Sequence, residues 1–125
     1  MNTKTASIII GLTFLAVGGL GFVANPIVGE DPAAIFYTDT THNIVHMVSG
    51  ALFLLVAMAM PANAAGFCKL FGVVYLLLGV VGLVKYGTDG MGKLLGFLHV
   101  NGADNFLHLG LGLIIFLAGT LKIKA

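Results

Sequence analysis

Charged residues are scarce in this sequence. Only 9% of its 125 residues are charged, with six lysines, no arginine and five acidic residues, whereas 58% are hydrophobic. A soluble domain of this size needs many more polar side chains to cover its surface. Nucleic-acid binding needs several basic groups on one face. The composition therefore excludes a soluble protein and a nucleic-acid partner, and it indicates a lipid bilayer as the surrounding solvent.

The sequence also lacks the residue patterns of most enzymes. It has one cysteine, Cys68, which cannot form an internal disulfide and which we expect to be a packed thiol. It contains no nucleophile beside a base, no phosphate-binding glycine loop and no paired carboxylates. Enzymatic activity is therefore not expected unless a bound metal or cofactor supplies it.

Long apolar runs dominate the chain instead. Each run is close to the ~20 residues that an α-helix needs to cross a ~30 Å hydrocarbon core. The runs cover residues 6–28, 44–60, 66–84 and 106–121, and candidate N-caps before the second and fourth runs are Asp39, Thr40, Thr41 and Asp104. The sequence therefore predicts an all-α, polytopic membrane four-helix bundle that forms a single transmembrane domain over residues 1–125.

An internal repeat divides the chain into two halves. A glycine and aromatic pattern recurs after 61 residues, and an Asn-x-x-His-x-x-x-Gly pattern recurs after 62. The first pattern matches Gly11, Phe14, Gly18 and Gly21 with Gly72, Tyr75, Gly79 and Gly82, and the second matches Asn43, His46 and Gly50 with Asn105, His108 and Gly112. This self-similarity predicts two tandem helical-hairpin repeats, about residues 6–60 and 64–122. Because each hairpin crosses the membrane twice, the two repeats are parallel rather than inverted.

Glycines form a stripe on the first and third predicted helices. Small residues let membrane helices approach each other closely, because association in lipid depends on packing contacts. We interpret six of them as helix-packing residues, namely Gly11, Gly18, Gly21, Gly72, Gly79 and Gly82. The alternative is that they leave space for a flat ligand.

Polar residues gather where the second and fourth helices begin. The first group is His42, Asn43 and His46, and the equivalent group is Asp104, Asn105 and His108. Residues four apart share a helix face. The repeat therefore predicts that both groups meet in one cluster near the outer membrane surface, with the two asparagines as structural members.

Three interpretations of this cluster are open. In the first, which we expect, the polar groups satisfy one another by hydrogen bonds and fasten the hairpins of a structural or accessory protein, whose partners are other membrane subunits or a second copy. In the second, a divalent metal (zinc, copper or iron) binds His42, His46, Asp104 and His108. In the third, His46 and His108 are axial ligands of a haem or other tetrapyrrole. A small transporter is a further alternative.

Two segments of the chain resemble a known family. They are THNIVH at residues 41–46, followed by Gly50, and NGADNFLH at residues 101–108, followed by Gly112. In combination they resemble bacterial domain-of-unknown-function family 4383, and the similarity extends over nearly the whole chain. The resemblance implies a four-span protein of the bacterial inner membrane, and it implies no activity.

Lysine placement predicts the orientation of the chain in that membrane. One side of a four-span chain carries Lys4, Lys69, Lys122 and Lys124, and the other carries Lys85 and Lys93 together with the five acidic residues. Cytoplasmic flanks of membrane helices hold the excess of lysine and arginine. Both termini are therefore expected in the cytoplasm.

We predict that a green fluorescent protein fused after Ala125 fluoresces and that alkaline phosphatase fused there is inactive, because the former folds in the cytoplasm and the latter requires the periplasm. As a control, both reporters inserted within residues 26–41 are expected to give the opposite signals. Phosphatase activity from the C-terminal fusion would overturn the predicted orientation.

Overall fold

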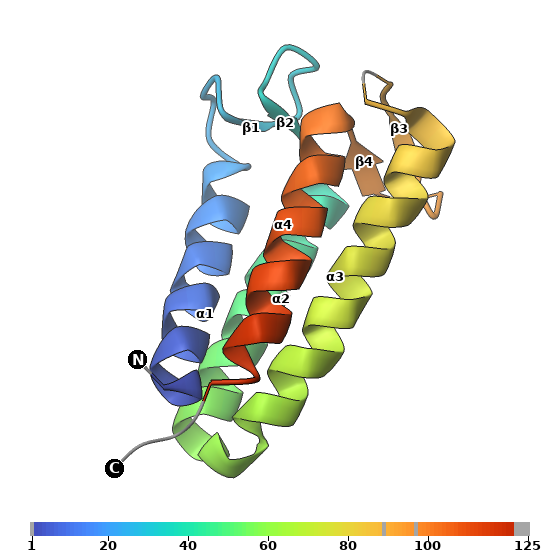
Figure 1. The fold of residues 1–125 in the computed structure, drawn as a ribbon. Helices are drawn as coiled ribbons and strands as arrows, with labels where there is room; N and C mark the ends of the chain where they lie inside the picture. Colours follow the sequence, from blue (N-terminus) through green and yellow to red (C-terminus); the bar gives the residue numbers. More distant parts are fainter. Residues whose placement is uncertain (1, 89, 97, 122–125) are drawn as a thin grey trace.

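The computed structural model describes residues 2–88, 90–96 and 98–121, and helices dominate this part of the chain (Figure 1). The helices are α1 (Thr3–Leu20), α2 (Thr40–Ala59), α3 (Ala64–Tyr86) and α4 (Gly102–Ala118), and a 3₁₀ turn over Pro61–Asn63 joins α2 to α3. The short strands are β1 (Val28–Gly29), β2 (Phe36–Tyr37), β3 (Gly92–Leu94) and β4 (Leu98–Val100). The predicted all-α fold class is confirmed.

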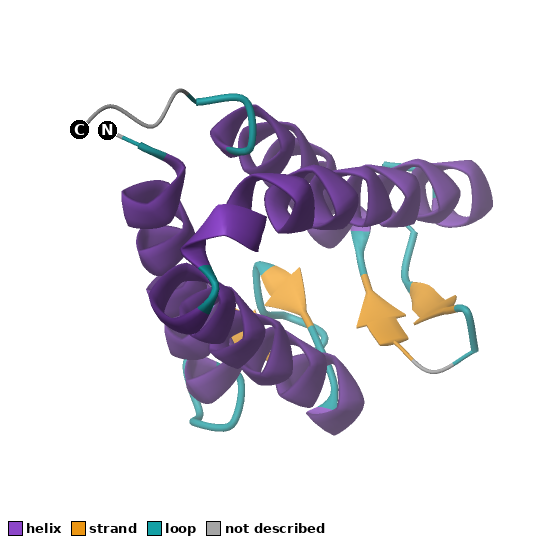
Figure 2. Cartoon of the chain, turned by 90° about the horizontal axis from the view of Figure 1, so that it is seen from below, coloured by secondary structure: helices purple, strands orange, loops and turns teal. Residues whose placement is uncertain are grey.

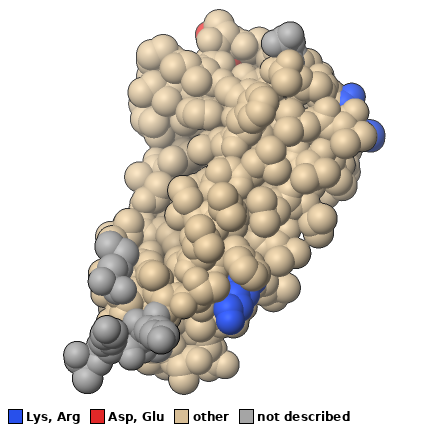
Figure 3. Space-filling view, in the orientation of Figure 1, with Lys and Arg blue, Asp and Glu red and all other residues tan. Residues whose placement is uncertain are grey.

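Three stretches of helix are long and apolar enough to cross a membrane. They are α1, α2 and the stretch Pro61–Tyr86, which combines the 3₁₀ turn with α3. α4 has 17 residues, so at 1.5 Å per residue it is about 26 Å long, shorter than a ~30 Å hydrocarbon core. On the face drawn in Figure 3, a broad surface without charged side chains separates the lysines near the two ends. The chain is therefore a membrane protein, and the crossing by α4 stays a prediction.

The first helix ends earlier than its apolar run predicts. α1 stops at Leu20, whereas the apolar run continues to Val28. Asn25 organises the intervening turn, because its Nδ2 donates to the carbonyl oxygens of Leu20, Val23 and Val28. Its Oδ1 also accepts from the backbone N–H of Val28. These hydrogen bonds replace helical ones and turn the apolar chain back toward the bundle.

α2 begins at a predicted cap, whereas α4 begins earlier than predicted. Asp39 caps α2, as predicted, and accepts a hydrogen bond of 2.7 Å from the backbone N–H of His42. The prediction of Asp104 as the cap of α4 was wrong, because Asn101 takes that position and Asp104 lies in the first turn. Asn is as good an N-cap as Asp, since its carbonyl oxygen also accepts from the first free N–H groups.

The outer loops fold back onto the bundle through short strands. In the first loop, β1 and β2 pair in parallel, with Val28 opposite Phe36. In the second, β3 and β4 form an antiparallel hairpin whose residues Leu94, Leu98 and Val100 are buried against the helices. The first loop thus contributes Phe36 and Tyr37 to β2, and the second contributes Leu94 to β3 and Leu98 to β4. Phe97 lies outside the described residues.

Each helix packs most closely against its partner in the same hairpin, α1 against α2 and α3 against α4 (Figure 2). A Cβ added at Gly18 would lie 2.8 Å from the carbonyl oxygen of Asn43, and one added at Gly79 would lie 2.9 Å from that of Asn105. Only glycine permits this separation. Gly11 and Gly72 make equally close contacts, with Gly50 and with Phe116 of the partner helices.

Aromatic side chains fill the core between the two hairpins. Phe14 of α1 stacks on Phe53 of α2 at 5.8 Å between ring centroids and contacts Tyr75 of α3 at 5.2 Å. At the end of the bundle opposite the strands, Thr3 Oγ1 donates to the carbonyl oxygen of Ala118 over 2.8 Å. The start of α1 and the end of α4 are therefore neighbours (Figure 1).

We predict that Gly18→Ala lowers the free energy of unfolding by about 1–3 kcal/mol, because its methyl group would overlap α2 and force the helices apart. Gly19→Ala is the matched control, since a Cβ at Gly19 has no neighbour within 4 Å, and it should be neutral or stabilising by up to about 1 kcal/mol. Denaturation followed by circular dichroism in detergent measures both. Equal effects of the two substitutions would contradict close packing at Gly18.

Candidate functional site

Three histidines lie together beneath the strands. His42 and His46 are one turn apart on α2, and His108 faces them from α4. Their exposed fractions are 1%, 2% and 1%. One ligand atom from each of them lies within 4.8 Å of the other two. The structure therefore brings together three of the four residues predicted as metal ligands, from both halves of the chain.

His42 is held by the backbone of the second outer loop. Its Nδ1 lies 2.7 Å from the carbonyl oxygen of His99 in β4. A carbonyl oxygen can only accept a hydrogen bond, so Nδ1 carries the proton. In the neutral ring Nε2 is then unprotonated, and an unprotonated imidazole nitrogen is the one that binds metals.

His46 and His108 have ring nitrogens without hydrogen-bond partners. Within the described residues, both nitrogens of His46 and Nδ1 of His108 are buried and unpaired. Leaving a buried polar group unpaired costs about 1–3 kcal/mol, and few such groups occur in native proteins. The self-satisfied hydrogen-bond network expected from the sequence is therefore not formed by these two rings.

Asp104, the fourth predicted ligand, is directed elsewhere. Its Oδ2 accepts a 2.9 Å hydrogen bond from the backbone N–H of Asn101, whose Oδ1 accepts in return from the backbone N–H of Asp104 over 3.0 Å. This reciprocal capping box holds the carboxylate against the start of α4. Asp104 shares a helix face with His108, but it is absent from the group of ligand atoms that the three histidines form.

Asn43 and Asn105 pack within their own hairpins. Both are fully buried, and the amide oxygens take the places where Cβ atoms of Gly21 and Gly82 would stand. In the described part of the chain, neither carboxamide has a hydrogen-bond partner. The two asparagines occupy equivalent places in the two hairpins, at the level of the histidines.

His99 remains outside the cluster of imidazoles. Its ring stacks on Tyr37 of β2 at 4.9 Å between centroids, and its Nδ1 lies 4.0 Å from Asp39 Oδ2. Its side chain is partly exposed. The side chain of His99 thus joins the two outer loops, while its main chain supports His42.

Aromatic rings enclose the inner side of the cluster. Phe14 lies 5.7 Å from His46 and Tyr75 lies 5.6 Å from His108, between ring centroids. Neither Phe14 nor Tyr75 was predicted as part of the site. The internal repeat could have indicated them, because Phe14 and Tyr75 occupy equivalent positions among the repeated glycines.

The rings leave little room for a tetrapyrrole between His46 and His108. Their centroids are 6.4 Å apart, but His42 lies 4.4 Å from His46 and 5.5 Å from His108. A macrocycle bound between the two axial candidates would have to displace His42 and its hydrogen bond. The arrangement fits a single ion better than a flat cofactor.

Comparison with known proteins places this chain in a family. The model of a domain of unknown function (DUF4383) matches residues 4–121. The chain belongs to this family. No curated protein and no solved structure matches the chain. The description of the DUF4383 family assigns no activity to its members.

We predict that Asn101→Ala lowers the free energy of unfolding by about 1 kcal/mol, because it removes the cap of α4. It also removes the hydrogen bond that Asn101 Nδ2 donates to the carbonyl oxygen of Ile35 in the other loop. Asn63→Ala is the matched control, since Asn63 precedes α3 without a capping hydrogen bond. Thermal unfolding in detergent compares them, and equal losses would refute a special role for Asn101.

Proposed function

We propose that this DUF4383 protein binds one transition-metal ion in the membrane through His42, His46 and His108. The observation that carries the proposal is the set of buried ring nitrogens on His46 and His108 that have no partner in the described part of the chain. They lie next to a third ring, that of His42, whose proton is held by the His99 carbonyl oxygen. A metal ion would bind one nitrogen of each of the three rings. Polar residues inside a membrane are costly and commonly functional.

The distances between the ligand atoms of the cluster support the binding of a single metal ion. Metal–nitrogen bonds of about 2.0–2.1 Å place two ligands of a tetrahedral ion about 3.3 Å apart. The ligand atoms here lie within 4.8 Å of one another. Small rotations of the imidazole rings would close the site, and the carbonyl oxygen of His99 would keep the ring of His42 oriented by accepting its Nδ1 proton.

The ligand chemistry favours zinc or copper over iron. Three imidazoles form a neutral set, which suits zinc and copper, whereas non-haem iron commonly has a carboxylate beside two histidines. The carboxylate of Asp104 is engaged in the helix cap. Three protein ligands would leave a fourth position for water or another small ligand, as in catalytic rather than structural zinc sites.

The membrane setting of the site is also a proposal. Lysine placement supports cytoplasmic termini, which puts the cluster near the outer face of the bacterial inner membrane. The matched contacts of Gly18 with Asn43 and of Gly79 with Asn105 support two parallel hairpin repeats in one transmembrane domain. The position of His46 and His108 on corresponding helices follows from that repeat.

A structural or accessory role is the second candidate. One observation favours it, because the hydrogen bond from His42 to the His99 carbonyl joins α2 to the second outer loop. Docking to other membrane subunits or to a second copy would belong to this role. It predicts that replacing His46 or His108 changes stability alone, in a protein that holds no metal.

We predict that the detergent-purified protein, stripped with a chelator, takes up one Zn²⁺ or Cu²⁺ per chain. His108→Ala and His46→Ala should lose this uptake. Binding should raise the free energy of unfolding by about 2.7 kcal/mol when the free metal concentration is 100 times the dissociation constant. Elemental analysis and thermal unfolding make the two measurements.

The fourth histidine provides the matched control. His99→Ala removes a ring outside the cluster but keeps the carbonyl oxygen that orients His42, so its metal uptake should equal that of the wild type. Asp104→Ala should also retain uptake, although with lower stability. A wild-type protein without stoichiometric metal, or one that keeps it in His108→Ala, would refute the proposed function.

A further inference from the structure

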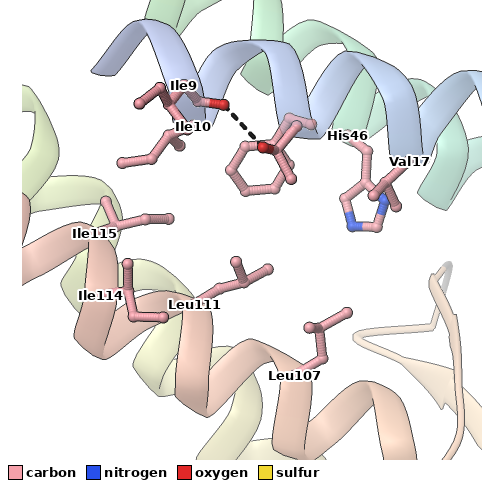
Figure 4. Close-up of a pocket in the computed structure, with 10 residues that line it drawn as sticks. Ile9, Ile10, Val17, His46, Leu107, Leu111, Ile114 and Ile115 are labelled. Atoms are coloured by element: carbon pink, nitrogen blue, oxygen red, sulfur yellow. Dashed lines mark hydrogen bonds between the residues drawn. The ribbon is translucent and has the colours of Figure 1, made fainter. Parts of the chain in front are cut away.

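An apolar cavity of about 210 Å³ lies between α1 and α4. These helices come from different hairpins and face each other across it, whereas glycines close the gap within each hairpin. Figure 4 shows Ile10 and Val17 of α1 on one side and Leu107 and Leu111 of α4 on the other. The ring of His46, from α2, stands at one end of the space.

His46 supplies the free hydrogen-bonding groups of this cavity. Among the lining residues, polar side-chain atoms belong to Thr13 and His46. Thr13 Oγ1 donates to the carbonyl oxygen of Ile9 in its own helix over 2.8 Å. His46 is 2% exposed, and neither of its ring nitrogens has a hydrogen-bond partner among the residues that the structure describes. The cavity therefore has apolar walls and one polar end.

The rim of the cavity lies on the lipid-facing side of the helices. Ile9 of α1 and Ile114 of α4 both line it, and they are 47% and 60% exposed. Because α1 is long and apolar enough to span a membrane, its exposed apolar residues face hydrocarbon. A ligand would reach His46 from within the bilayer, so it has to be soluble in lipid.

The volume and the polar end together specify the ligand class. A cavity of about 150 Å³ is enough to hold benzene, so this cavity accommodates one substituted six-membered ring. The unpaired N–H of the His46 imidazole calls for a hydrogen-bond acceptor at the inner end of that ring. An uncharged carbonyl oxygen meets this need without bringing a charge into lipid, and an alkyl chain does not meet it.

We propose that this cavity binds a lipid-soluble quinone, with the ring between α1 and α4, a carbonyl oxygen accepting a hydrogen bond from His46, and the tail in the bilayer. The site shares His46 with the proposed metal site but does not depend on metal binding. An imidazole has two nitrogens, so the ring of His46 can bind an ion through one and donate from the other. Quinone binding needs no metal and can be measured in the metal-free protein.

Native mass spectrometry of the metal-free protein, released from detergent, tests this inference with decylubiquinone as the probe. We expect one adduct per chain. Ile114→Trp should lose it by at least tenfold in affinity, because the larger ring fills the mouth. Leu113→Trp is the matched control, since Leu113 is 53% exposed on the same helix and does not line the cavity, and it should keep the adduct.

His46→Phe keeps a ring of similar size and removes the hydrogen bond. It should weaken the adduct about five- to tenfold, as expected for one neutral hydrogen bond. An unchanged adduct in Ile114→Trp or in His46→Phe would overturn the proposal. Binding of n-decanol with the same affinity as decylubiquinone would also overturn it, because n-decanol has an oxygen and an alkyl chain but no ring. Ile114→Trp should retain metal uptake, so failure of the quinone site is distinguishable from failure of the metal site.

Discussion

Close contact between paired helices determines where the functional side chains stand. At Gly18 and Gly79 the backbone of one helix meets the carbonyl oxygen of an asparagine on its partner, at separations that exclude any side chain. In lipid there is no hydrophobic drive to bring helices together, so such contacts largely decide the packing. The asparagines precede His46 and His108 by one turn, and the contacts thereby set the height and rotation of both histidines.

The histidine cluster combines features that oppose each other energetically. The rings are buried among aromatic side chains and apolar helices, where unpaired polar atoms are destabilising. Yet helix capping by Asp39 and Asn101 places His42 and His108 there reliably, since each cap determines where its helix begins. A fold that maintains unpaired imidazoles in this setting is more easily understood if a ligand completes their bonding than if packing alone is the reason.

Much of the fold was predictable from the sequence, because apolar runs and caps are local signals. The helices and the meeting of His42, His46 and His108 follow from hydropathy and from the repeat. The short strands could not be predicted from the sequence, since β1 and β2 contain too few residues to show an alternating pattern of apolar and polar residues. The role of Asp104 was missed for a different reason. Its spacing from His108 suits a shared ligand, but the local capping box with Asn101 competes for the same carboxylate.

The support of His42 by a main-chain oxygen has a consequence for how this site can change between related proteins. Any residue at position 99 offers the same carbonyl group, so the support of His42 depends on the path of β4 and not on the side chain of residue 99, whose stacking on Tyr37 is a separate contact. A comparison of sequences at position 99 would therefore not reveal the support of His42. The shape of the hairpin from β3 to β4 fixes the position of the His99 carbonyl oxygen, and this constraint can be recognised from the structure but not from the sequence.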